Sequence, residues 1–252
     1  MLLYLLLIFI VISIVISFSF FKKREKQTKQ LTFKTNADLY DKEYVEMYDA
    51  VTYDYYRLQK DIQTIMPSTS ADSYILDIGS GTGHHVHELN EKGIKTIGID
   101  KSAAMVKYSK KNKHRFIEGN AMHMTTFHNE SFTHITCFYY TLYCIDNKKQ
   151  FLHNVYKWLT PGGLFIVHLS KKCTYGKHTK LIDSKYTYKR TIRENKVYET
   201  ITKGNNIRRN EHMFYMESIP TIVTIAQNQG FSVLSNDSYD LYNELYIFKK
   251  PE

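Results

Sequence analysis

The feature that most constrains this sequence is an apolar run that leads directly into a glycine-rich turn. The segment reads Ile75-Leu-Asp-Ile-Gly-Ser-Gly-Thr-Gly83, with glycine at positions 79, 81 and 83. A short apolar run bounded by turn residues is typical of a buried strand. Glycines at such a turn let the backbone approach a ligand closely. The segment therefore predicts a strand, a ligand-binding loop and the start of a helix.

The pattern around this loop alternates between strand and helix. The predicted strands are 73–78, 96–99, 114–117, the apolar run 133–143, 164–168, 232–234 and 245–248, and the predicted helical segments are 37–65, 84–92, 103–111, 148–159 and 219–229. Strands that alternate with helices favour an α/β fold, in which a mostly parallel sheet carries helices on both faces.

Residues 171–217 interrupt this alternation. They contain stretches with strand-like alternation at 186–192, 196–202 and 213–216, separated by charged or Gly/Asn turns. Such stretches are typical of antiparallel strands joined by short turns. We therefore expect a small antiparallel lid insertion here, within a domain that extends from residue 37 to residue 252.

The first 21 residues contain no charged side chain. About twenty helical residues at ~1.5 Å each match a ~30 Å hydrocarbon core. No basic region precedes the apolar run and no small-residue cleavage site follows it, which favours a retained anchor over a cleaved signal peptide. We expect a transmembrane helix at 1–21 and a basic, polar linker at 22–36. The basic flank predicts a single-pass membrane protein with a cytoplasmic catalytic domain.

Composition restricts the remaining possibilities. The chain has 252 residues, a formal net charge of +9 and three cysteines. The charge could attract anionic lipid, nucleic acid or an acidic substrate, but solvated lysine-rich faces explain it more simply. Cys137, Cys144 and Cys173 form no CxxC pair and no zinc-ligand spacing. We expect no metal site.

An acidic residue follows the next predicted strand. Asp100 lies about twenty residues beyond the glycines, where a carboxylate can bind both hydroxyls of a ribose. Together, the form Asp77-x-Gly-x-Gly-x-Gly83 and the spacing to Asp100 resemble motif I of class I S-adenosylmethionine-dependent methyltransferases. The resemblance extends over residues 48–249.

The resemblance implies a Rossmann-like, doubly wound sheet of seven strands that binds S-adenosyl-L-methionine. Asn120 stands where the family more often has Asp, and its carbonyl oxygen can still accept from the adenine amino group. Carried over to this sequence, the cofactor-binding residues are Asp77, Gly79, Ser80, Gly81, Gly83, Asp100, Lys101, Asn120, Ala121 and Phe138.

The catalytic candidates follow from position. His168 is predicted at the carboxyl end of a strand, the edge at which such sheets bind ligands, and Tyr139 and Tyr140 follow another strand. All three are equally compatible with packing. His84 and His85 are expected to cap or pack at the start of their helix. Three further tyrosines belong either to the core or to an N-terminal lid over the cofactor: Tyr40, Tyr48 and Tyr53.

The expected activity is methyl transfer to a nitrogen or oxygen at the cytosolic membrane face. The chain lacks the Asn/Asp-Pro-Pro-aromatic motif of enzymes that methylate nucleobase amines, and no cysteine follows a proline. A small-molecule, lipid-linked or protein acceptor is therefore favoured over nucleic acid, and the end of the chain is similar to the sugar N-methyltransferase subgroup. One alternative is a catalytically inactive, membrane-tethered scaffold. Another is an NAD-dependent oxidoreductase, whose Gly-x-Gly-x-x-Gly spacing the loop does not match.

Overall fold

A seven-stranded mixed sheet forms the centre of the protein. The computed structural model describes residues 1, 4, 8–17, 30–173, 179–182 and 186–252. Strands β2 to β6 run parallel, β12 is antiparallel to β6, and β11 is antiparallel to β12. The order across the sheet is β11 (Ser232–Ser238), β12 (Asn243–Lys249), β6 (Leu159–Ser170), β5 (Phe132–Cys137), β2 (Tyr74–Ile78), β3 (Lys95–Asp100) and β4 (Arg115–Glu118).

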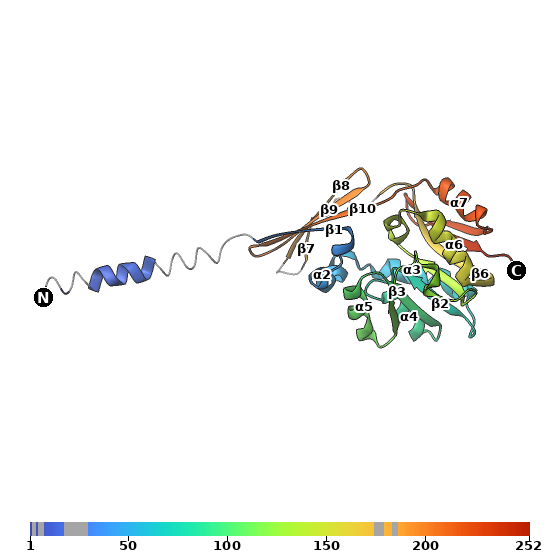
Figure 1. Cartoon of the computed structure of the whole chain (residues 1–252), viewed down its shortest axis with the longest axis horizontal. Helices are drawn as coiled ribbons and strands as arrows, with labels where there is room; N and C mark the ends of the chain where they lie inside the picture. The colour runs from blue at the N-terminus through green and yellow to red at the C-terminus, as the bar shows by residue number, and fades with distance from the viewer. Residues whose placement is uncertain (2–3, 5–7, 18–29, 174–178, 183–185) are drawn as a thin grey trace.

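Helices cover both faces of this sheet (Figure 1). They are α2 (Lys42–Thr52), α3 (Tyr55–Ile65), α4 (His84–Glu91), α5 (Ala103–Ser109), α6 (Lys148–Trp158) and α7 (Ile219–Asn228), with short 3-10 helices η1 (Asn36–Asp38), η2 (Met66–Ser68), η3 (Lys110–Asn112), η4 (Met124–Thr126) and η5 (Thr141–Cys144). Successive strand residues face opposite ways. Ile75 of β2 accordingly packs with Leu58 and Ile62 of α3, whereas Leu76 belongs to the cluster that contains Phe151 of α6 and Ile222 of α7. The prediction of a Rossmann-like sheet between two helical layers is confirmed.

A second sheet of five strands forms the lid. Its order is β1 (Gln30–Thr35), β10 (Asn206–Met213), β9 (Lys196–Lys203), β8 (Tyr186–Arg193) and β7 (Thr179–Ile182). Strands β7 to β10 are antiparallel neighbours, as predicted for residues 171–217. Residues 174–178 and 183–185 of that insertion lie outside the described residues. The predicted strand 213–216 is wrong, because the last strand of the insertion is β10 and ends at Met213.

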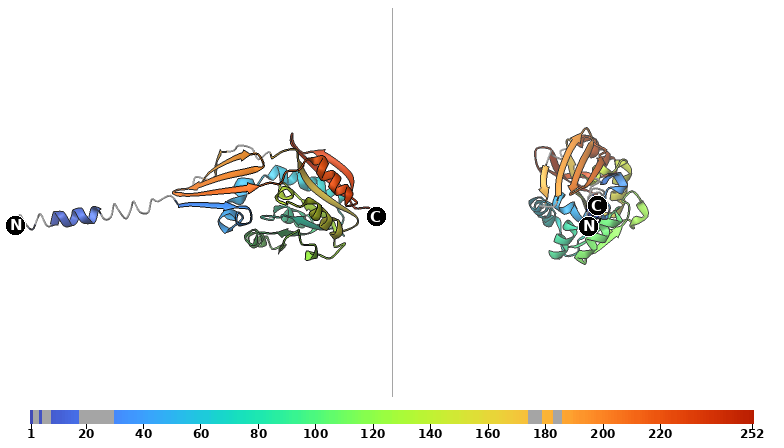
Figure 2. Two further views of the ribbon diagram at one scale, coloured as in Figure 1. Left: turned by 45° about the horizontal axis from the view of Figure 1, so that its top comes forward. Right: turned by 90° about the vertical axis from the view of Figure 1, so that its left-hand side faces the viewer.

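Strand β1 corrects the predicted linker at 22–36. It pairs in parallel with β10, and Figure 2 shows the two strands side by side. Residues 22–29 lie outside the described residues. The segment 30–35 resembles a linker because its sequence, QLTFKT, is mainly polar and has only two apolar residues, Leu31 and Phe33. Its partner strand, β10, lies far along the chain, so no local sequence pattern predicts the pairing.

The helical segment predicted at 37–65 is divided into two helices. Asp54 lies between them and its side chain accepts a hydrogen bond from the backbone N–H of Arg57. Asp41 caps α2 in the same manner, by accepting from Tyr44. Carboxylate caps satisfy backbone donors that have no partner within the helix. The break between α2 and α3 therefore has a local chemical cause.

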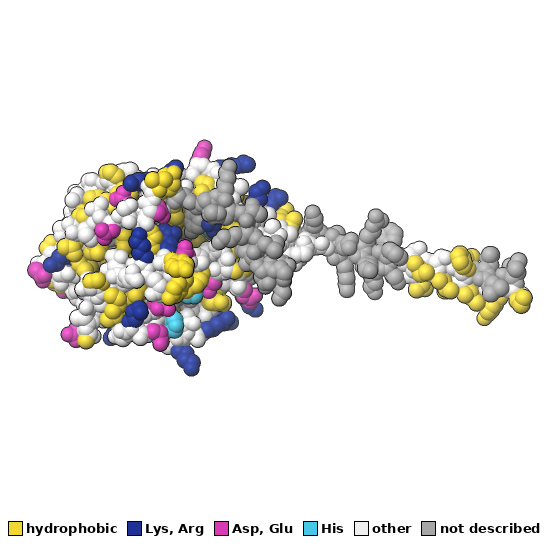
Figure 3. Space-filling model, turned by 180° about the vertical axis from the view of Figure 1, so that it is seen from behind, with side chains coloured by type: hydrophobic (Ala, Val, Ile, Leu, Met, Phe, Trp, Pro, Cys, Tyr) yellow, Lys and Arg dark blue, Asp and Glu magenta, His cyan; other side chains and the backbone are white. Residues whose placement is uncertain are grey.

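The predicted membrane anchor is also corrected. Within the part of the chain that the structure describes, no helix has both the length and the apolarity required to cross a bilayer. Residues 8–17 are helical and their apolar side chains are uncovered in Figure 3, but ten residues extend only about 15 Å, half of a ~30 Å hydrocarbon core. Residues 2–3, 5–7 and 18–21 of the expected helix lie outside the described residues. The prediction of a single-pass membrane protein with a cytoplasmic catalytic domain depended on this anchor and is wrong as well.

Candidate functional site

The glycine loop leaves the carboxyl end of β2 and turns sharply beneath the end of β3. The backbone N–H groups of Gly79 and Ser80 donate to the carbonyl of Ile99 at 2.8 and 3.1 Å. Gly79 has φ +71°, and a Cβ there would lie 2.3 Å from the Thr141 side chain. Glycine is therefore required at this position by both backbone conformation and space. The turn holds the following backbone N–H groups at the sheet edge where such folds bind ligands.

Asp100 ends β3 directly beside this loop. One carboxylate oxygen accepts from the backbone N–H of Gly81 at 2.9 Å, and the other accepts from that of Ser102 at 2.8 Å. Burial raises the pKa of Asp100, and these two hydrogen bonds oppose the rise. An ionised carboxylate has about four lone-pair sites, so each oxygen still has one for a ligand hydroxyl. The neighbouring Lys101 is exposed.

Asp77 is the buried acid of the site. Asp77 is 3% exposed, and its carboxylate accepts a hydrogen bond from the Thr136 hydroxyl at 2.7 Å. Burial raises the pKa of Asp77 to about 6; the charges of Asp100 and Asp61 add to the rise, and His85 opposes it. A cationic ligand group beside Asp77 would stabilise its ionised form.

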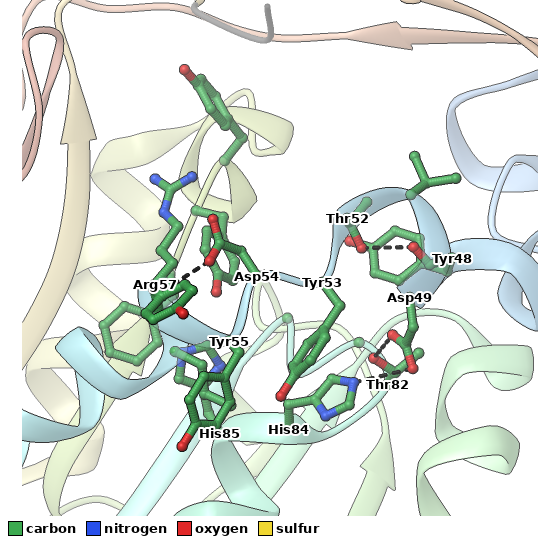
Figure 4. A pocket seen from close by; sticks show the side chains of 18 of the residues that line it. Tyr48, Asp49, Thr52, Tyr53, Asp54, Tyr55, Arg57, Thr82, His84 and His85 are labelled. Carbon is green, nitrogen blue, oxygen red and sulfur yellow. Dashed lines mark hydrogen bonds and ion pairs between the residues drawn. The ribbon is translucent and has the colours of Figure 1, made fainter. Parts of the chain in front are cut away.

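A cavity of about 880 Å³ opens above the glycine loop. Figure 4 shows its wall, formed largely by residues from the junction of α2 and α3. Of the predicted site residues, the cavity brings together Asp77, Gly79, Ser80, Gly81, Phe138, Tyr139 and Tyr140. The remaining six do not line it: Gly83, Asp100, Lys101, Asn120, Ala121 and His168. The volume lies within the range of ligand-binding pockets.

Asn120 and Ala121 lie in the loop after β4. The Asn120 side-chain oxygen accepts from the backbone N–H of Met122 at 3.0 Å, so it stabilises its own turn. Its second lone pair remains for a ligand. The carbonyl of Ala121 accepts from Asn154 of α6 at 2.9 Å. Gly119, just before them, donates to the carbonyl of Asp100, which ties this loop to the end of β3.

The α2–α3 junction is fastened to the glycine loop by polar contacts. The Thr82 hydroxyl donates to Asp49 at 2.6 Å, and His84 lies 3.1 Å from the same carboxylate. The ring of Tyr53 packs on His84 with centroids 4.3 Å apart, as Figure 4 shows. Tyr48 also lines the cavity. Tyr48 and Tyr53 thus lie where an N-terminal lid was expected.

Tyr40, the third tyrosine considered for that lid, does not line the cavity. Its ring packs against Tyr44 and Tyr48, and its carbonyl accepts from the Ser102 hydroxyl at 2.7 Å. It therefore joins the segment before α2 to the start of α5.

The lid sheet is joined to α2 through a buried acid. Glu199 of β9 is 2% exposed and accepts hydrogen bonds from Tyr44 of α2 and from four lid side chains: Tyr188, Arg190, Asn210 and His212. Burial opposes ionisation of Glu199, but His212, Arg190 and Tyr188 outweigh it and hold its pKa well below the usual value. Since Arg190 also lines the cavity, this network fixes one wall of the site.

His168 does not have the environment of a catalytic base. It is 2% exposed, its Nδ1 accepts from the backbone N–H of Tyr139 at 2.9 Å, and its Nε2 lies 3.0 Å from Asp61. Burial lowers the pKa of His168, against the raising effect of Asp61. With both ring nitrogens engaged, His168 holds the loop after β5 rather than facing a ligand.

Asp61 and His85 form a pair that the sequence pattern did not reveal. Asp61 of α3 is fully buried, and its second oxygen lies 3.0 Å from Nε2 of His85. Burial opposes its ionisation, yet the hydrogen bonds with His168 and His85 outweigh this and hold the Asp61 pKa well below its usual value. His85 lines the cavity and stacks on Phe138. The available signal was an aspartate on the buried face of α3, between Leu58 and Ile62.

The loop after β5 carries backbone strain at the cavity. Tyr139 has φ +53°, which is uncommon for a residue with a side chain. The hydrogen bond from its N–H to His168 and the edge-to-face contacts of its ring with His85 and His168 hold this conformation. The Tyr140 hydroxyl lies 3.3 Å from Ser170 Oγ, which directs it toward β6. Both tyrosines line the cavity, so they shape it and need not react.

Three possible metal ligands occur together away from this cavity. His87, Glu91 and His114 place their ligand atoms within 4.8 Å of one another. Nδ1 of His87 lies 3.0 Å from Nε2 of His114, a distance at which the two rings share a hydrogen bond. This bond satisfies the two nitrogens without an ion.

Comparison with known proteins agrees with this geometry. Residues 76–167, from β2 to β6, match the sequence profile of the methyltransferase domain family. The chain carries a methyltransferase domain. No curated protein sequence matches the chain.

Solved structures place the methyltransferase domain in a known fold. CcbJ methyltransferase from Streptomyces caelestis has a TM-score of 0.71 at 13% identity, covering 85% of this chain and 98% of its own. An S-adenosylmethionine-dependent methyltransferase from Clostridium acetobutylicum gives 0.64 at 19% identity, with coverage of 83% and 98%. CalS10 from Micromonospora echinaspora, an amino pentose methyltransferase with S-adenosylmethionine bound, gives 0.65 at 14%, with coverage of 84% and 98%. The fold is that of S-adenosylmethionine-dependent methyltransferases, and together with the domain match it supports this cofactor.

Proposed function

We propose that this methyltransferase transfers the methyl group of S-adenosylmethionine to a nitrogen or oxygen of a small-molecule acceptor. The observation that carries the proposal is the cavity above the glycine loop, which has that loop and Asp77 on one wall and aromatic and arginine side chains on another. A volume of about 880 Å³ lies in the upper part of the range of small-molecule pockets. Residues of the α2–α3 junction and Arg190 of the lid line its walls, which favours small acceptors.

The residues present fit the cofactor. The turn at Gly79 and Gly81 leaves a surface without side chains, and both oxygens of Asp100 retain lone pairs for the ribose hydroxyls. We assign Asp77 to the amino group of the methionine part, because a cationic partner compensates the cost of burying an ionised carboxylate. Asn120 is the residue of this chain that would accept from the adenine amino group.

When bound, the cofactor supplies a methyl group on a positively charged sulfur, and the charge is lost as the acceptor atom attacks. The contribution of the chain is mainly alignment, which can account for much of the acceleration of such a displacement. The strained loop at Tyr139 and the stacked pair of His85 and Phe138 form a rigid wall beside the reacting atoms.

His85 replaces His168 as the proposed proton acceptor. Its Nε2 is held by Asp61, and among the described residues its Nδ1 has no hydrogen-bond partner. With Nε2–H donating to the carboxylate, Nδ1 carries the lone pair at the cavity wall, an arrangement suited to a general base. The acceptor loses its proton to Nδ1, and Asp61 stabilises the imidazolium that results. An acceptor that attacks in its neutral form without losing a proton first does not need this step.

Cofactor binding is the direct test. The full chain is titrated with S-adenosylmethionine, S-adenosylhomocysteine and NAD by calorimetry, alongside Asp100→Ala and the control Glu118→Ala. Glu118 ends the neighbouring strand in register with Asp100 but is exposed. We expect micromolar binding of both sulfur compounds, unchanged by the control and weakened by at least about 30-fold in Asp100→Ala, as for loss of one or two charge-assisted hydrogen bonds.

Two outcomes contradict the proposal. A folded chain that binds neither sulfur compound is an inactive scaffold on a methyltransferase fold. Binding of NAD in their place means that the glycine loop serves a different cofactor. If the expected binding is found, isotopically labelled S-adenosylmethionine is then used to screen amines and alcohols for methyl transfer.

A further inference from the structure

One wall of the cavity contains an arginine in contact with two aromatic rings. Arg57 lies in the first turn of α3, with its guanidinium carbon 4.6 Å from the ring centre of Tyr139 and 5.1 Å from that of Tyr239. Figure 4 shows its side chain extending away from the glycine loop, beside Asp54. Contact with aromatic faces fixes the plane of a guanidinium while its N–H groups remain free to bind.

No described acidic side chain forms an ion pair with Arg57, although the charge of Arg57 helps to lower the pKa of Asp240. Within the described part of the chain, no carboxylate lies within ion-pair distance of it, and its buried Nε has no hydrogen-bond partner. The nearby acids are engaged elsewhere: Asp54 caps α3, and Asp240 accepts from Asn243 and from the backbone of Tyr242. Arg57 therefore lines the cavity as a guanidinium without a paired carboxylate, which points to a ligand that supplies the counter-charge.

The other arginine of the cavity behaves differently. Arg190 lines the lid side and is paired with Glu199 at 3.2 Å. Its charge is therefore already compensated by the buried network of the lid. Of the two arginines that line the described cavity, Arg57 is the one that forms no ion pair.

We infer that Arg57 binds an anionic group of the methyl acceptor, a carboxylate or a phosphate. This rests on the proposed function, because it assigns the acceptor to the part of the cavity that Arg57 lines. A guanidinium matches both groups through paired N–H···O bonds. Anchoring the acid group there leaves the remainder of the acceptor to extend toward His85, which lines the same cavity. The acceptor is thus an amine or alcohol that also carries an acid group.

Anion titration tests the inference without knowledge of the acceptor. The full chain, with and without S-adenosylhomocysteine, is titrated with acetate, inorganic phosphate and pyrophosphate, with sodium chloride as the ionic-strength control. The readouts are the melting temperature and the ¹H–¹⁵N signal of Arg57 Nε, assigned by its loss in Arg57→Gln. We expect at least one of the three anions to shift that signal with a Kd on the order of millimolar. A stronger response to acetate than to phosphate indicates a carboxylate on the acceptor, and the reverse indicates a phosphate.

Lys60→Gln is the matched control. Lys60 lies one turn further along α3, is exposed, and also stacks on Tyr239 at 4.2 Å. We expect Arg57→Gln to weaken anion binding at least about tenfold, while S-adenosylhomocysteine binds both variants as it binds the native chain. The inference is overturned if the anions leave the Arg57 signal unmoved, or if Arg57→Gln responds as the native chain does. If the native chain does not bind S-adenosylhomocysteine at all, this separate result contradicts the proposed function and not the inference about Arg57.

Discussion

Replacing Asp61 with asparagine tests the role assigned to His85 with little change of shape. In the native chain one carboxylate faces Nε2 of His168 and Nε2 of His85, each at 3.0 Å. Nδ1 of His168 already accepts from Tyr139, so Nε2 of His168 must donate. In Asp61→Asn the amide oxygen of the new side chain is expected to face His168, and its NH₂ group then faces His85. Nε2 of His85 becomes an acceptor, and its proton moves to Nδ1.

The magnitudes follow from these two contacts. Each charge-assisted hydrogen bond, worth about 1.5–3 kcal/mol, becomes a neutral one of about 0.5–1.5 kcal/mol, so the variant loses about 2 kcal/mol of stability. For a chain of this size the melting temperature should fall by about 4–8 °C. Where the acceptor must be deprotonated, loss of the lone pair at Nδ1 should lower kcat by about 10² to 10⁴.

The assay is long-range ¹H–¹⁵N spectroscopy of the histidine rings, combined with thermal unfolding and S-adenosylhomocysteine titration. His153, a partly buried histidine of α6 that is hydrogen-bonded to Gln229, serves as an internal reference. Cofactor affinity should be retained, because Asp61 does not line the cavity. An unchanged His85 tautomer in Asp61→Asn, or full kcat with an acceptor that needs deprotonation, refutes the reasoning.

The Asp61 pKa is held below its usual value, so its contribution to stability is present at neutral pH and disappears as the pH falls below about 4. The stability difference between native chain and Asp61→Asn should therefore narrow in acid. Equilibrium unfolding by urea at several pH values measures this.

Asp77 and Glu199 give two further predictions. Burial raises the Asp77 pKa to about 6, whereas a bound ammonium group favours the ionised form of Asp77. The affinity for S-adenosylhomocysteine should therefore rise up to about tenfold from pH 5 to pH 7, with release of a proton on binding at the lower pH. Calorimetry in buffers of different ionisation enthalpy measures both effects, and Asp77→Asn should remove the pH dependence. Glu199→Gln leaves Arg190 and His212 without their buried counter-charge and should cost about 3–5 kcal/mol in urea unfolding. Glu211→Gln, which breaks the exposed ion pair with Lys196, should cost much less, and equal losses from the two substitutions contradict the network.

The central fold could be predicted because its signals are local. Strands such as β2 and β5 are buried on both faces, so each appears as an apolar run between turn residues. The lid strand β10 reads NIRRNEHM and lacks such a pattern, because its buried positions hold Arg208 and Asn210. The apolar N-terminal run meets the length rule for a membrane helix, whereas the helical residues described there, 8–17, are too few.

The site was predictable only where one stretch of chain forms it. The glycines, Asp77 and Asp100 are recognisable by spacing, and the structure connects Asp100 directly to Gly81. Asp61 and Arg57 acquire their surroundings when α3 packs beside α4 and the end of β6, which no spacing within α3 reveals. A place at the end of a strand favours His168 in the sequence, and the structure shows that its nitrogens are already engaged there.

The pairing of β1 with β10 has a consequence for synthesis of the protein. Residues joined in this ladder, such as Gln30 and Asn206, are about 176 positions apart. At about 5–20 residues per second, a ribosome needs roughly 10 to 35 s to make the chain between them. During that interval β1, with its apolar Leu31 and Phe33, has no partner strand and offers an open edge to other chains. A nascent-chain chaperone that covers residues 30–35 should therefore raise the yield of native protein more than one that acts after release.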